Sequence, residues 1–443
     1  MVAPKRKKYM NEKVLLHTPF DVNMILVILF LNIFGLIMIY SASYYYAQAT
    51  YGFDAAYFFR NQLIYVIAGI AVMIAAGFIR PSKYRHLWVV FMIGAAALVA
   101  AVRIPGIGWA SHGAYRWIKI GSRTIQIAEP VKLLMILFLA GVMTRFRITK
   151  PWVHWFIYLF TAVISVGLLV LSNNMSTALI VFGMMFLMMM VSYPRQKWFW
   201  IVIAAGVVLA VVGIIYIGRF LPYSKDENFR ITRIRAWLDP NAEQYMSDEA
   251  YQALQAIYAI GSGGFFGKGL GQSLIKFKLP EPHNDYILAI IFEELGIFGV
   301  LLLTYLFIYL LYKIFRVFLE TRERFNRLIV LGVFLHLAIQ VILNYAVTLG
   351  LFPTMGVTLP FISAGGSAVF FTMAEVGLVL AVDRQNREDR LYRQASRELE
   401  AEDPYYRRIL QEQAEKEEEA AKERKAALLA AKREKDAAKK KKR

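Results

Sequence analysis

Apolar segments long enough to cross a lipid bilayer recur along most of the 443-residue chain. A membrane-spanning helix needs about 20 mostly apolar residues, and only helices or closed barrels satisfy every backbone hydrogen bond within lipid. Such segments lie at 22–46, 61–79, 86–104, 130–146, 152–171, 175–193, 197–218, 285–312, 328–349 and 366–383. The sequence therefore predicts an all-α, polytopic membrane protein with about ten transmembrane helices and argues against a soluble protein.

The charged residues predict how these helices are oriented. The N-terminal KRKK, every second loop and the tail are rich in Lys and Arg, and such segments stay in the cytoplasm. With ten spans, both termini are expected to be cytoplasmic. We expect a basic N-terminus (1–20) that leads into a retained first helix, a transmembrane domain (21–383) and a charged tail (384–443). The net charge of +19 is then explained by the orientation of the helices in the membrane and by attraction to anionic lipid. No nucleic-acid partner is predicted.

Two of the expected external loops, 105–129 and 219–284, are too long to be simple connections. Loops longer than about 15 residues are usually functional or disordered. Loop 105–129 is basic although it is expected outside, which indicates a functional reason for its charge. Loop 219–284 contains GSGGFFGKGLGQ (261–272), in which no Ser or Thr follows Gly267-Lys268, so it is not a phosphate-binding loop of the GxxxxGK[ST] type. We expect it to form tight turns or re-entrant backbone.

The segment WASHGAYRWIKIGSR (109–123) is the best candidate for an anion site. Arg116, Lys119 and Arg123 would hold a pyrophosphate, and Trp117 and the neighbouring aromatic residues would stack on a sugar. The alternative is an aromatic belt at the membrane interface that contacts lipid headgroups.

Ionisable residues at membrane depth are candidates for function. Glu129 and Lys132 lie three residues apart on one helical face, which suits either a structural pair or a functional one. Glu293 and Glu294 lie about 12 Å further along their helix than Asp285, and we expect them to form a buried polar network with Lys132 or backbone groups as partners. Glu375 is a further candidate within the membrane.

Asp285 lies where loop 219–284 meets the following helix. Asn284 and Asp285 are both good N-cap residues. A half-buried carboxyl at this position would also have a raised pKa and could act as a general base, and the two roles are compatible. His283 is a lone histidine without a second one at ligand spacing. Because the chain also has no cysteine, no metal site is predicted.

Four segments resemble the SEDS membrane proteins, the group of FtsW, RodA and SpoVE. HGAYRWIKIG (112–121) is similar to the family's NGAxRWI-x-x-G loop, and QIAEPVK (126–132) to its QxSEhxK run. PEPHNDYILAIIFEELG (280–296) is similar to PExHTDFIFAxIxEELG. LGLFPTMGVTLPFISAGGSA (349–368) is similar to GLLPxTGxTLPFxSYGGSS, in a form closer to the FtsW and SpoVE branch. The resemblance implies the SEDS fold, with two large external loops.

The resemblance also implies an activity: a glycosyltransferase that polymerises lipid II into peptidoglycan at the external face of the bacterial cell membrane, for the division or spore septum. Asp285 matches the catalytic aspartate, and we expect Arg116, Trp117, Lys119, Lys132, Glu129 and His283 to bind substrate. Expected partners are lipid II, a class B penicillin-binding protein that acts as transpeptidase, and other division proteins. No cofactor is predicted, and the need for a divalent cation is left open.

The chain departs from the family pattern at three positions. Asn174, in SNNMST (172–177), replaces the acid of QPDxGT, Asn284 replaces a threonine, and Ala364 replaces a tyrosine.

Two other functions are alternatives to glycosyl transfer. A lipid II flippase would use Lys132, Glu293, Glu294 and Glu375 to line a path, although the sequence shows no inverted repeat. A non-catalytic scaffold of the division machinery would recruit a transpeptidase.

Overall fold

The computed structural model describes residues 20–111, 114–121, 123–146, 151–192, 197–221, 229–239 and 249–402, with isolated positions beyond. The predictions for residues 1–19 and for the tail after residue 402 lie outside this part of the chain. The chain divides into two compact units, of which one runs from Pro19 to Arg384 and carries all the transmembrane helices. The second contains Gln385 onward, where α13 continues to Glu402.

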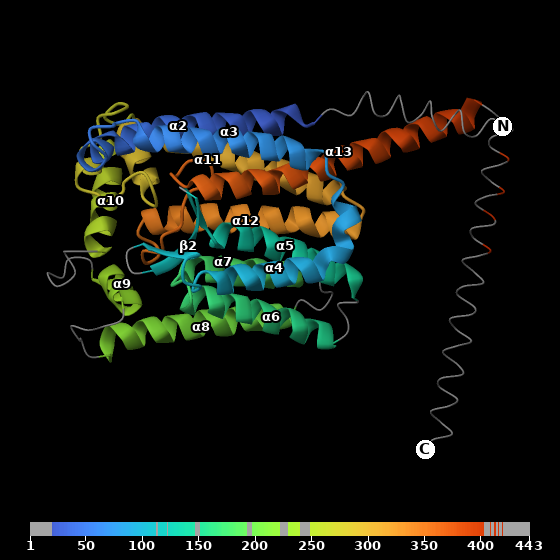
Figure 1. The fold of residues 1–443 in the computed structure, drawn as a ribbon, viewed down its shortest axis with the longest axis horizontal. Helices are drawn as coiled ribbons and strands as arrows, with labels where there is room; N and C mark the ends of the chain where they lie inside the picture. Colours follow the sequence, from blue (N-terminus) through green and yellow to red (C-terminus); the bar gives the residue numbers. More distant parts are fainter. Residues whose placement is uncertain are drawn as a thin grey trace, which may run out of the picture. The chain divides into compact units, whose positions relative to one another are not determined.

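Long helices form most of the first unit (Figure 1). Their bounds are α2 Val22–Thr50, α3 Tyr57–Gly77, α4 Trp88–Ala101, α5 Ala128–Arg145, α6 Pro151–Val170, α7 Met175–Ser192, α8 Lys197–Arg219, α11 Ile287–Glu320, α12 Arg324–Thr348 and α13 Gly366–Glu402. Nine helices in the described part of the chain are long and apolar enough to span a membrane. The tenth predicted span, α5, is not among them. It has 18 residues, of which Glu129, Lys132 and Arg145 are charged.

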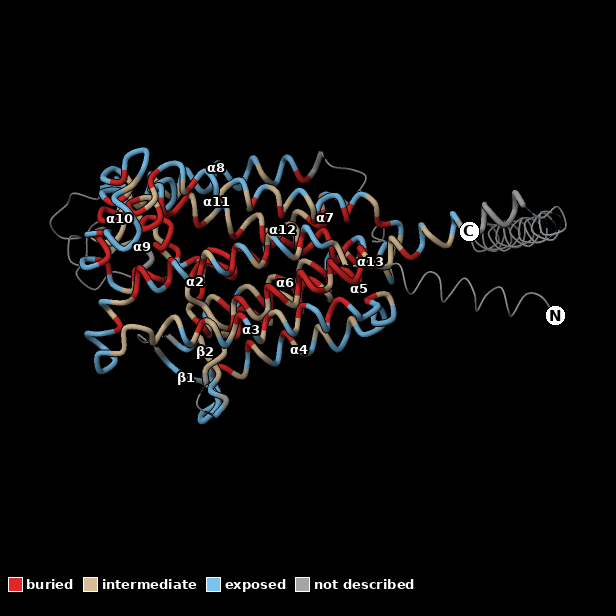
Figure 2. The backbone as a smooth tube through the Cα atoms, turned by 90° about the horizontal axis from the view of Figure 1, so that it is seen from above, coloured by how far each residue is buried: buried red, intermediate tan, exposed pale blue. Residues whose placement is uncertain are grey.

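The core lies between the middle helices of the unit. α5 packs between α4 and α12, and α12 also contacts α7 and α11. Met135, Phe138 and Ile329 are fully buried there, whereas Leu209 on α8 is 71% exposed. Figure 2 shows this contrast along the helices. Apolar side chains can cover the outside of the unit because lipid is the solvent there. Association of the helices therefore depends on close packing between them and not on removal of apolar surface from water.

Shorter elements gather at one end of the helices (Figure 1). They include α9 Phe229–Leu238, α10 Glu249–Gly263 and η3 Ile275–Phe277, all within loop 219–284. Loop 105–129 forms a three-stranded antiparallel sheet of β1 Gly108–Ser111, β2 Ala114–Ile120 and β3 Arg123–Gln126, in the order β1-β2-β3. This sheet is a difference from the purely helical expectation. At the other end, η1 Pro81–Leu87 precedes α4.

Helix α11 is broken at Gly296, where φ is 67° and ψ is −167°. A Cβ atom at Gly296 would lie 2.4 Å from the backbone nitrogen of Gly267, so only glycine fits. The break frees backbone groups, and the Gly-rich segment satisfies them. The amides of Lys268 and Gly269 donate to the carbonyls of Glu293 and Glu294, each at 2.9 Å. The segment 261–272 thus forms turns at glycines with positive φ and docks on α11.

Candidate active site

Asp285 lies between a turn and the first residue of α11. The turn is closed by Asn284, whose amide donates to Glu281 Oε2 at 2.6 Å. The prediction that Asn284 or Asp285 caps the helix is wrong, because Tyr286 occupies the N-cap position and no side chain there bonds a helix amide. Asn284 is already occupied by Glu281, and the carboxyl of Asp285 is free to serve another purpose.

The backbone around Asp285 is held by Asn344 of α12. Asn344 Nδ2 donates to the carbonyl of Asp285 at 2.9 Å and to that of Val357 at 2.6 Å. It therefore ties the start of α11 to the non-helical loop 349–365. On this loop, a Cβ atom at Gly356 would lie 3.3 Å from Asp285 Oδ2. The carboxyl thus faces bare backbone, in a position fixed by neighbouring elements.

Replacing Asn344 by leucine should destabilise the fold. Two buried carbonyl groups would lose their donor, and each such loss costs about 1–3 kcal/mol. The measurement is the thermal unfolding midpoint of purified protein in detergent. Asn32→Leu is the matched control, because its amide bonds only Ile28 of its own helix. The idea fails if both variants unfold at the same temperature.

The charges around Asp285 set its protonation. Burial, together with the nearby carboxylate of Glu281, raises the pKa of Asp285 to about 6, although the charges of Arg233 and Arg116 oppose the shift. A carboxyl with a pKa near the working pH can both take up and release a proton, as a general base must. Two cations beside it can also balance negative charge that develops during a reaction.

The small sheet positions Arg116 and separates it from Lys119. Arg116 Nη2 donates to the carbonyl of Asn173 at 2.9 Å, and its charge reaches Asp285. Successive side chains of a strand point to opposite faces, so Lys119 lies on the other face of β2, with Nζ 4.7 Å from the ring centre of Trp109. Trp117 pairs with Trp109 across the sheet. The structure therefore does not bring the two predicted anion-binding cations together, and the side chain of Arg123 lies outside the described residues.

Arg233 was not among the residues selected from the sequence. It comes from α9, which is tied to loop 349–365 by a bond from Trp237 Nε1 to the carbonyl of Gly350 at 2.8 Å. The available signal was FRITRIRAWL (229–238), a helical segment with repeated arginines in an external loop. The candidate site thus combines residues from four places in the chain: the sheet, α9, the start of α11 and loop 349–365.

A family model for FtsW, RodA and SpoVE, described as cell cycle protein, matches residues 21–388. The chain belongs to this family. Among its relatives, the probable peptidoglycan glycosyltransferase FtsW of Trichlorobacter lovleyi is 33% identical over 366 residues, which cover 82% of this chain and 93% of the relative. Stage V sporulation protein E of Bacillus subtilis is 34% identical over 371 residues, which cover 83% and 98%.

Solved structures confirm the SEDS fold. A chain of a peptidoglycan synthase complex that coordinates polymerization and crosslinking aligns with a TM-score of 0.67 at 23% identity, covering 83% of this chain and 98% of that one. RodA of Thermus thermophilus aligns with a TM-score of 0.59 at 23% identity, covering 84% and 98%. The predicted family resemblance and architecture are therefore confirmed.

In this family member, His283 lies within an aromatic cluster. Its side chain is 1% exposed, and its ring centre lies 4.0 Å from that of Phe58 and 5.7 Å from that of Tyr46. Burial lowers the pKa of His283 to about 4, so the ring is neutral near pH 7. Its carbonyl accepts a bond from the amide of Ala364 at 2.9 Å. These contacts favour a packing role behind Asp285.

Glu129 and Lys132 form a buried ion pair with an Nζ–Oε2 distance of 2.9 Å. They are 5% and 2% exposed. Lys132 Nζ also donates to Gln340 Oε1 at 3.2 Å, and Gln340 Nε2 donates to the carbonyl of Thr358 at 3.0 Å. The pair therefore links α5 to α12 and to loop 349–365.

The prediction that Lys132 partners Glu293 and Glu294 is wrong. Lys268 Nζ lies 2.5 Å from Glu293, and Lys276 Nζ lies 3.3 Å from Glu294. Lys268 belongs to the segment 261–272 that docks on the break in α11, and Lys276 belongs to η3, which follows this segment. Serines complete the cluster, with Ser273 bonded to Glu293 and Ser41 Oγ bonded to Glu294 at 2.6 Å. A buried polar network, as predicted, does surround both glutamates.

Asn174, a departure from the family pattern, and Glu375, the last of the intramembrane acids, both have hydrogen-bond partners. Asn174 accepts a bond from the amide of Thr177 at 3.1 Å and so caps the start of α7. Glu375 of α13 pairs with His336 Nδ1 at 2.6 Å. No three His, Asp or Glu side chains in the described ranges lie close enough to hold a metal ion together.

Proposed function

We propose that this chain is a peptidoglycan glycosyltransferase that polymerises lipid II, with Asp285 as the general base. The curated relatives support the activity, because they include proteins named probable peptidoglycan glycosyltransferase. The observation that carries the site assignment is the half-buried carboxyl of Asp285, with a pKa raised to about 6 between two arginines. Its backbone is fixed by Asn344.

In the proposed reaction, ionised Asp285 removes the proton from the 4-hydroxyl of the acceptor sugar. That oxygen attacks the anomeric carbon of the lipid-linked donor and forms the new glycosidic bond with inversion. The bond between the anomeric carbon and the phosphate oxygen breaks, and its electron pair stays on the pyrophosphate-lipid. Arg116 and Arg233, whose charges already reach Asp285, are suited to balance the departing charge. The proton ends on Asp285 and passes to water.

In this proposal, the other predicted binding residues differ in how directly they contact the substrate. Lys119 and Trp117 lie on the far face of β2 from Arg116 and would contact the more distant part of the lipid-linked substrate. Lys132 and Glu129 would act through loop 349–365, and His283 through the packing of its ring. Direct contact with substrate is thus assigned first to Asp285 and the two arginines.

The rate of polymerisation should rise with pH, reach half of its maximum near pH 6 and level off well above the pKa of Asp285. The ionised carboxylate is the active form, so its fraction increases as the pH passes through the pKa of Asp285. Arg116→Gln removes a charge that lowers this pKa, so the midpoint should move to higher pH. The measurement is kcat/KM for glycan synthesis between about pH 5 and 8.

Lys119→Gln is the matched control for this shift. Lys119 lies on the other face of β2, so its loss should leave the midpoint in place even where it lowers the rate. A flat profile across this pH range, or an equal shift in both variants, would contradict the assignment of the titrating group.

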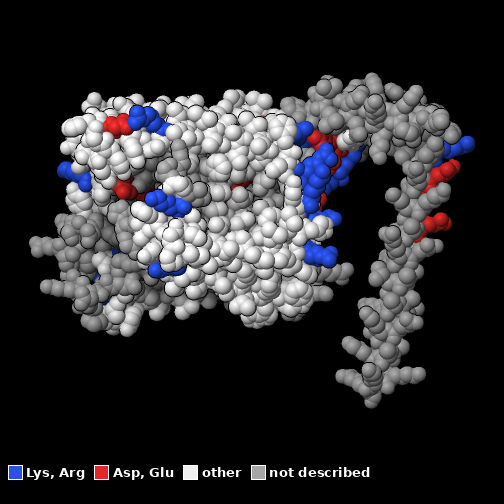
Figure 3. Space-filling model, in the orientation of Figure 1, with Lys and Arg blue, Asp and Glu red and all other residues white. Residues whose placement is uncertain are grey.

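We further propose that the chain spans the bacterial cell membrane with both termini cytoplasmic and with Asp285 at the external face, at the division septum. The charge distribution supports this orientation: Figure 3 shows Lys and Arg side chains concentrated at one end of the helices, and Arg322, Arg324 and Arg327 belong to that end of α11 and α12. Positively charged ends of transmembrane helices favour the cytoplasm. A class B penicillin-binding protein, further division proteins and anionic lipid are the proposed partners.

The direct test uses the purified chain with its transpeptidase partner and labelled lipid II, followed by separation of the glycan strands. The proposal expects strands in the presence of the full chain and none without it. The flippase alternative expects instead that the chain alone moves lipid II across vesicle membranes. The intramembrane charges give that alternative little support, because Lys132, Glu293, Glu294 and Glu375 belong to separate pairs, each satisfied locally.

A further inference from the structure

A pocket with a volume of about 490 Å³ lies at the opposite end of the helices from Asp285. α11 begins beside Asp285 and ends at Glu320, and the pocket forms where α11 and α7 end and α12 begins. Three of its lining residues are arginines, namely Arg322, Arg324 and Arg327. The site is remote from the proposed chemistry, and none of the residues used in the mechanism lines it.

The three arginines are exposed. No salt bridge to them is present in the part of the chain that the structure describes. The nearest acids in sequence are already engaged, since Glu323 Oε2 accepts from the amide of Asn326 at 2.7 Å and Glu320 pairs with Arg316 at 2.8 Å. Three guanidinium groups within six residues therefore present positive charge that the neighbouring acids do not bridge.

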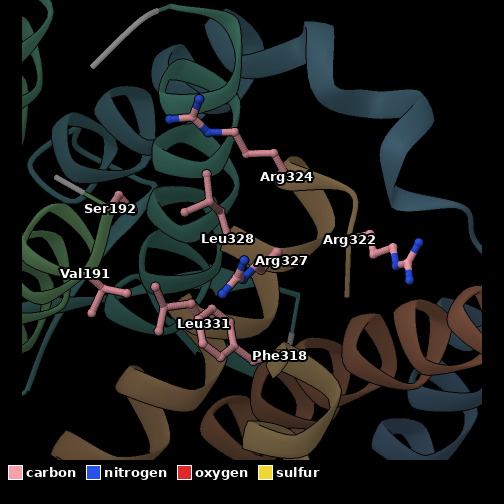
Figure 4. Close-up of a pocket in the computed structure, with 8 residues that line it drawn as sticks. All are labelled: Val191, Ser192, Phe318, Arg322, Arg324, Arg327, Leu328 and Leu331. Carbon is pink, nitrogen blue, oxygen red and sulfur yellow. The ribbon is translucent and has the colours of Figure 1, made fainter. Parts of the chain in front are cut away.

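The other wall of the pocket is apolar. Phe318, Leu328 and Leu331 are 7%, 5% and 3% exposed, and the Arg327 guanidinium carbon lies 4.7 Å from the ring centre of Phe318. Figure 4 shows the three guanidinium groups spread around the pocket rather than gathered at one point, with Arg327 between Leu328 and Phe318. A ligand that fits this arrangement carries separated negative charges and an apolar part.

The position of the pocket identifies the source of such a ligand. Transmembrane helices end at the depth of the lipid headgroups, and basic pockets between helix ends on the cytoplasmic side bind anionic headgroups. We propose that the Arg322, Arg324 and Arg327 pocket binds the phosphate groups of an anionic phospholipid, with the acyl chains leaving along the apolar wall. Separated guanidinium groups favour a lipid with two phosphates over a lipid with one, because planar guanidinium groups each bind one phosphate through paired N–H donors.

The test measures lipid retention and thermal stability of the full chain in detergent micelles doped with one lipid at a time. The probes are diphosphatidylglycerol, phosphatidylglycerol and zwitterionic phosphatidylcholine, with inorganic pyrophosphate as the soluble source of the same chemistry. The combined variant Arg322→Gln, Arg324→Gln, Arg327→Gln should bind diphosphatidylglycerol about 100-fold more weakly, because each interfacial arginine adds several-fold to the affinity. Arg316→Gln is the matched control. This variant loses a guanidinium at the same end of the helices, but one that is already paired with Glu320.

The proposal is supported if the wild type and Arg316→Gln retain diphosphatidylglycerol and the combined variant does not. It is overturned if the combined variant retains the lipid, or if Arg316→Gln loses as much affinity. It is also overturned if pyrophosphate stabilises the wild type as strongly as the lipid does, since the ligand would then be soluble. Stabilisation of the wild type by an acidic peptide but by no lipid would overturn it in favour of a protein partner. The far-ultraviolet circular dichroism of each variant shows that it is folded.

Discussion

Asp285→Asn is expected to reduce the synthesis of glycan strands by about 100-fold or more, because a general base contributes roughly 10² to 10⁴ to a rate. Asparagine has nearly the same shape but cannot accept the proton. The contacts that hold this position are made by the backbone carbonyl of Asp285, which accepts from Asn344, and these survive the change. The assay is the rate of strand synthesis from labelled lipid II by the purified chain with its transpeptidase partner.

Asp54→Asn is the matched control. Asp54 also lies in a loop between helices, but its carboxylate pairs with exposed Arg60, and its charge does not shift the pKa of Asp285. This variant should keep the wild-type rate. Strand synthesis by Asp285→Asn at the wild-type rate would remove Asp285 from the mechanism. A loss of thermal stability in Asp285→Asn would show instead that the residue is needed for folding.

Lys276→Met is expected to be among the most destabilising single changes in the chain. Lys276 and Glu294 are both fully buried, and removal of one partner of a buried ion pair costs about 3–5 kcal/mol because the other charge remains unpaired. Glu294 would retain Ser41 Oγ and the amide of Ser273, but no other cation among the described residues pairs with it. The thermal unfolding midpoint in detergent, together with the yield of monodisperse protein, measures the effect.

The double variant Lys276→Met, Glu294→Gln separates the charge effect from the loss of packing. Most of the lost stability should return, because no buried charge is left without a partner. Arg316→Gln provides a surface comparison, since exposed ion pairs contribute only about 0–1 kcal/mol. If the double variant is as unstable as Lys276→Met alone, the pair contributes through side-chain packing rather than through charge.

The helices could be predicted from the sequence because lipid imposes a length and a composition on each of them. The segment 197–218 became α8, Lys197–Arg219, and 175–193 became α7, Met175–Ser192. The sheet in loop 105–129 was not predicted. Its strands have four to seven residues and are rich in aromatic and basic residues, so they resemble an interfacial loop as closely as a strand.

The break in α11 shows a second limit of sequence reasoning. Apolar runs flank the segment Glu293–Gly296 on both sides, so hydropathy alone predicts one continuous helix. The break is visible only through its contact with Gly267, and this contact depends on how the 261–272 segment folds. The incorrect prediction that Lys132 pairs with the two glutamates has the same cause. Which lysines reach Glu293 and Glu294 depends on how the chain before α11 folds against this helix.

The site was predicted in part. Asp285 and Arg116 could be selected because an acid and a base at membrane boundaries are unusual and because both lie in motifs of the family. The structure places them within electrostatic reach of one another, although their roles stay a prediction. Arg233 was missed because arginines in a long loop are common, and only the docking of α9 on loop 349–365 brings this one close to the carboxyl.

The docking of the Gly-rich segment on α11 has a consequence for biosynthesis. Lys268 precedes Glu293 by 25 residues and Lys276 precedes Glu294 by 18, so each lysine leaves the ribosome before its carboxylate. Charged side chains enter a membrane at a high free-energy cost, and closing so short a segment costs little entropy. The nascent chain can therefore neutralise both glutamates locally, before the helices that follow are made. The contacts to α2 are made with residues far back in the chain, namely Ser41 beside Glu294 and the ring of Tyr44 beside Lys276.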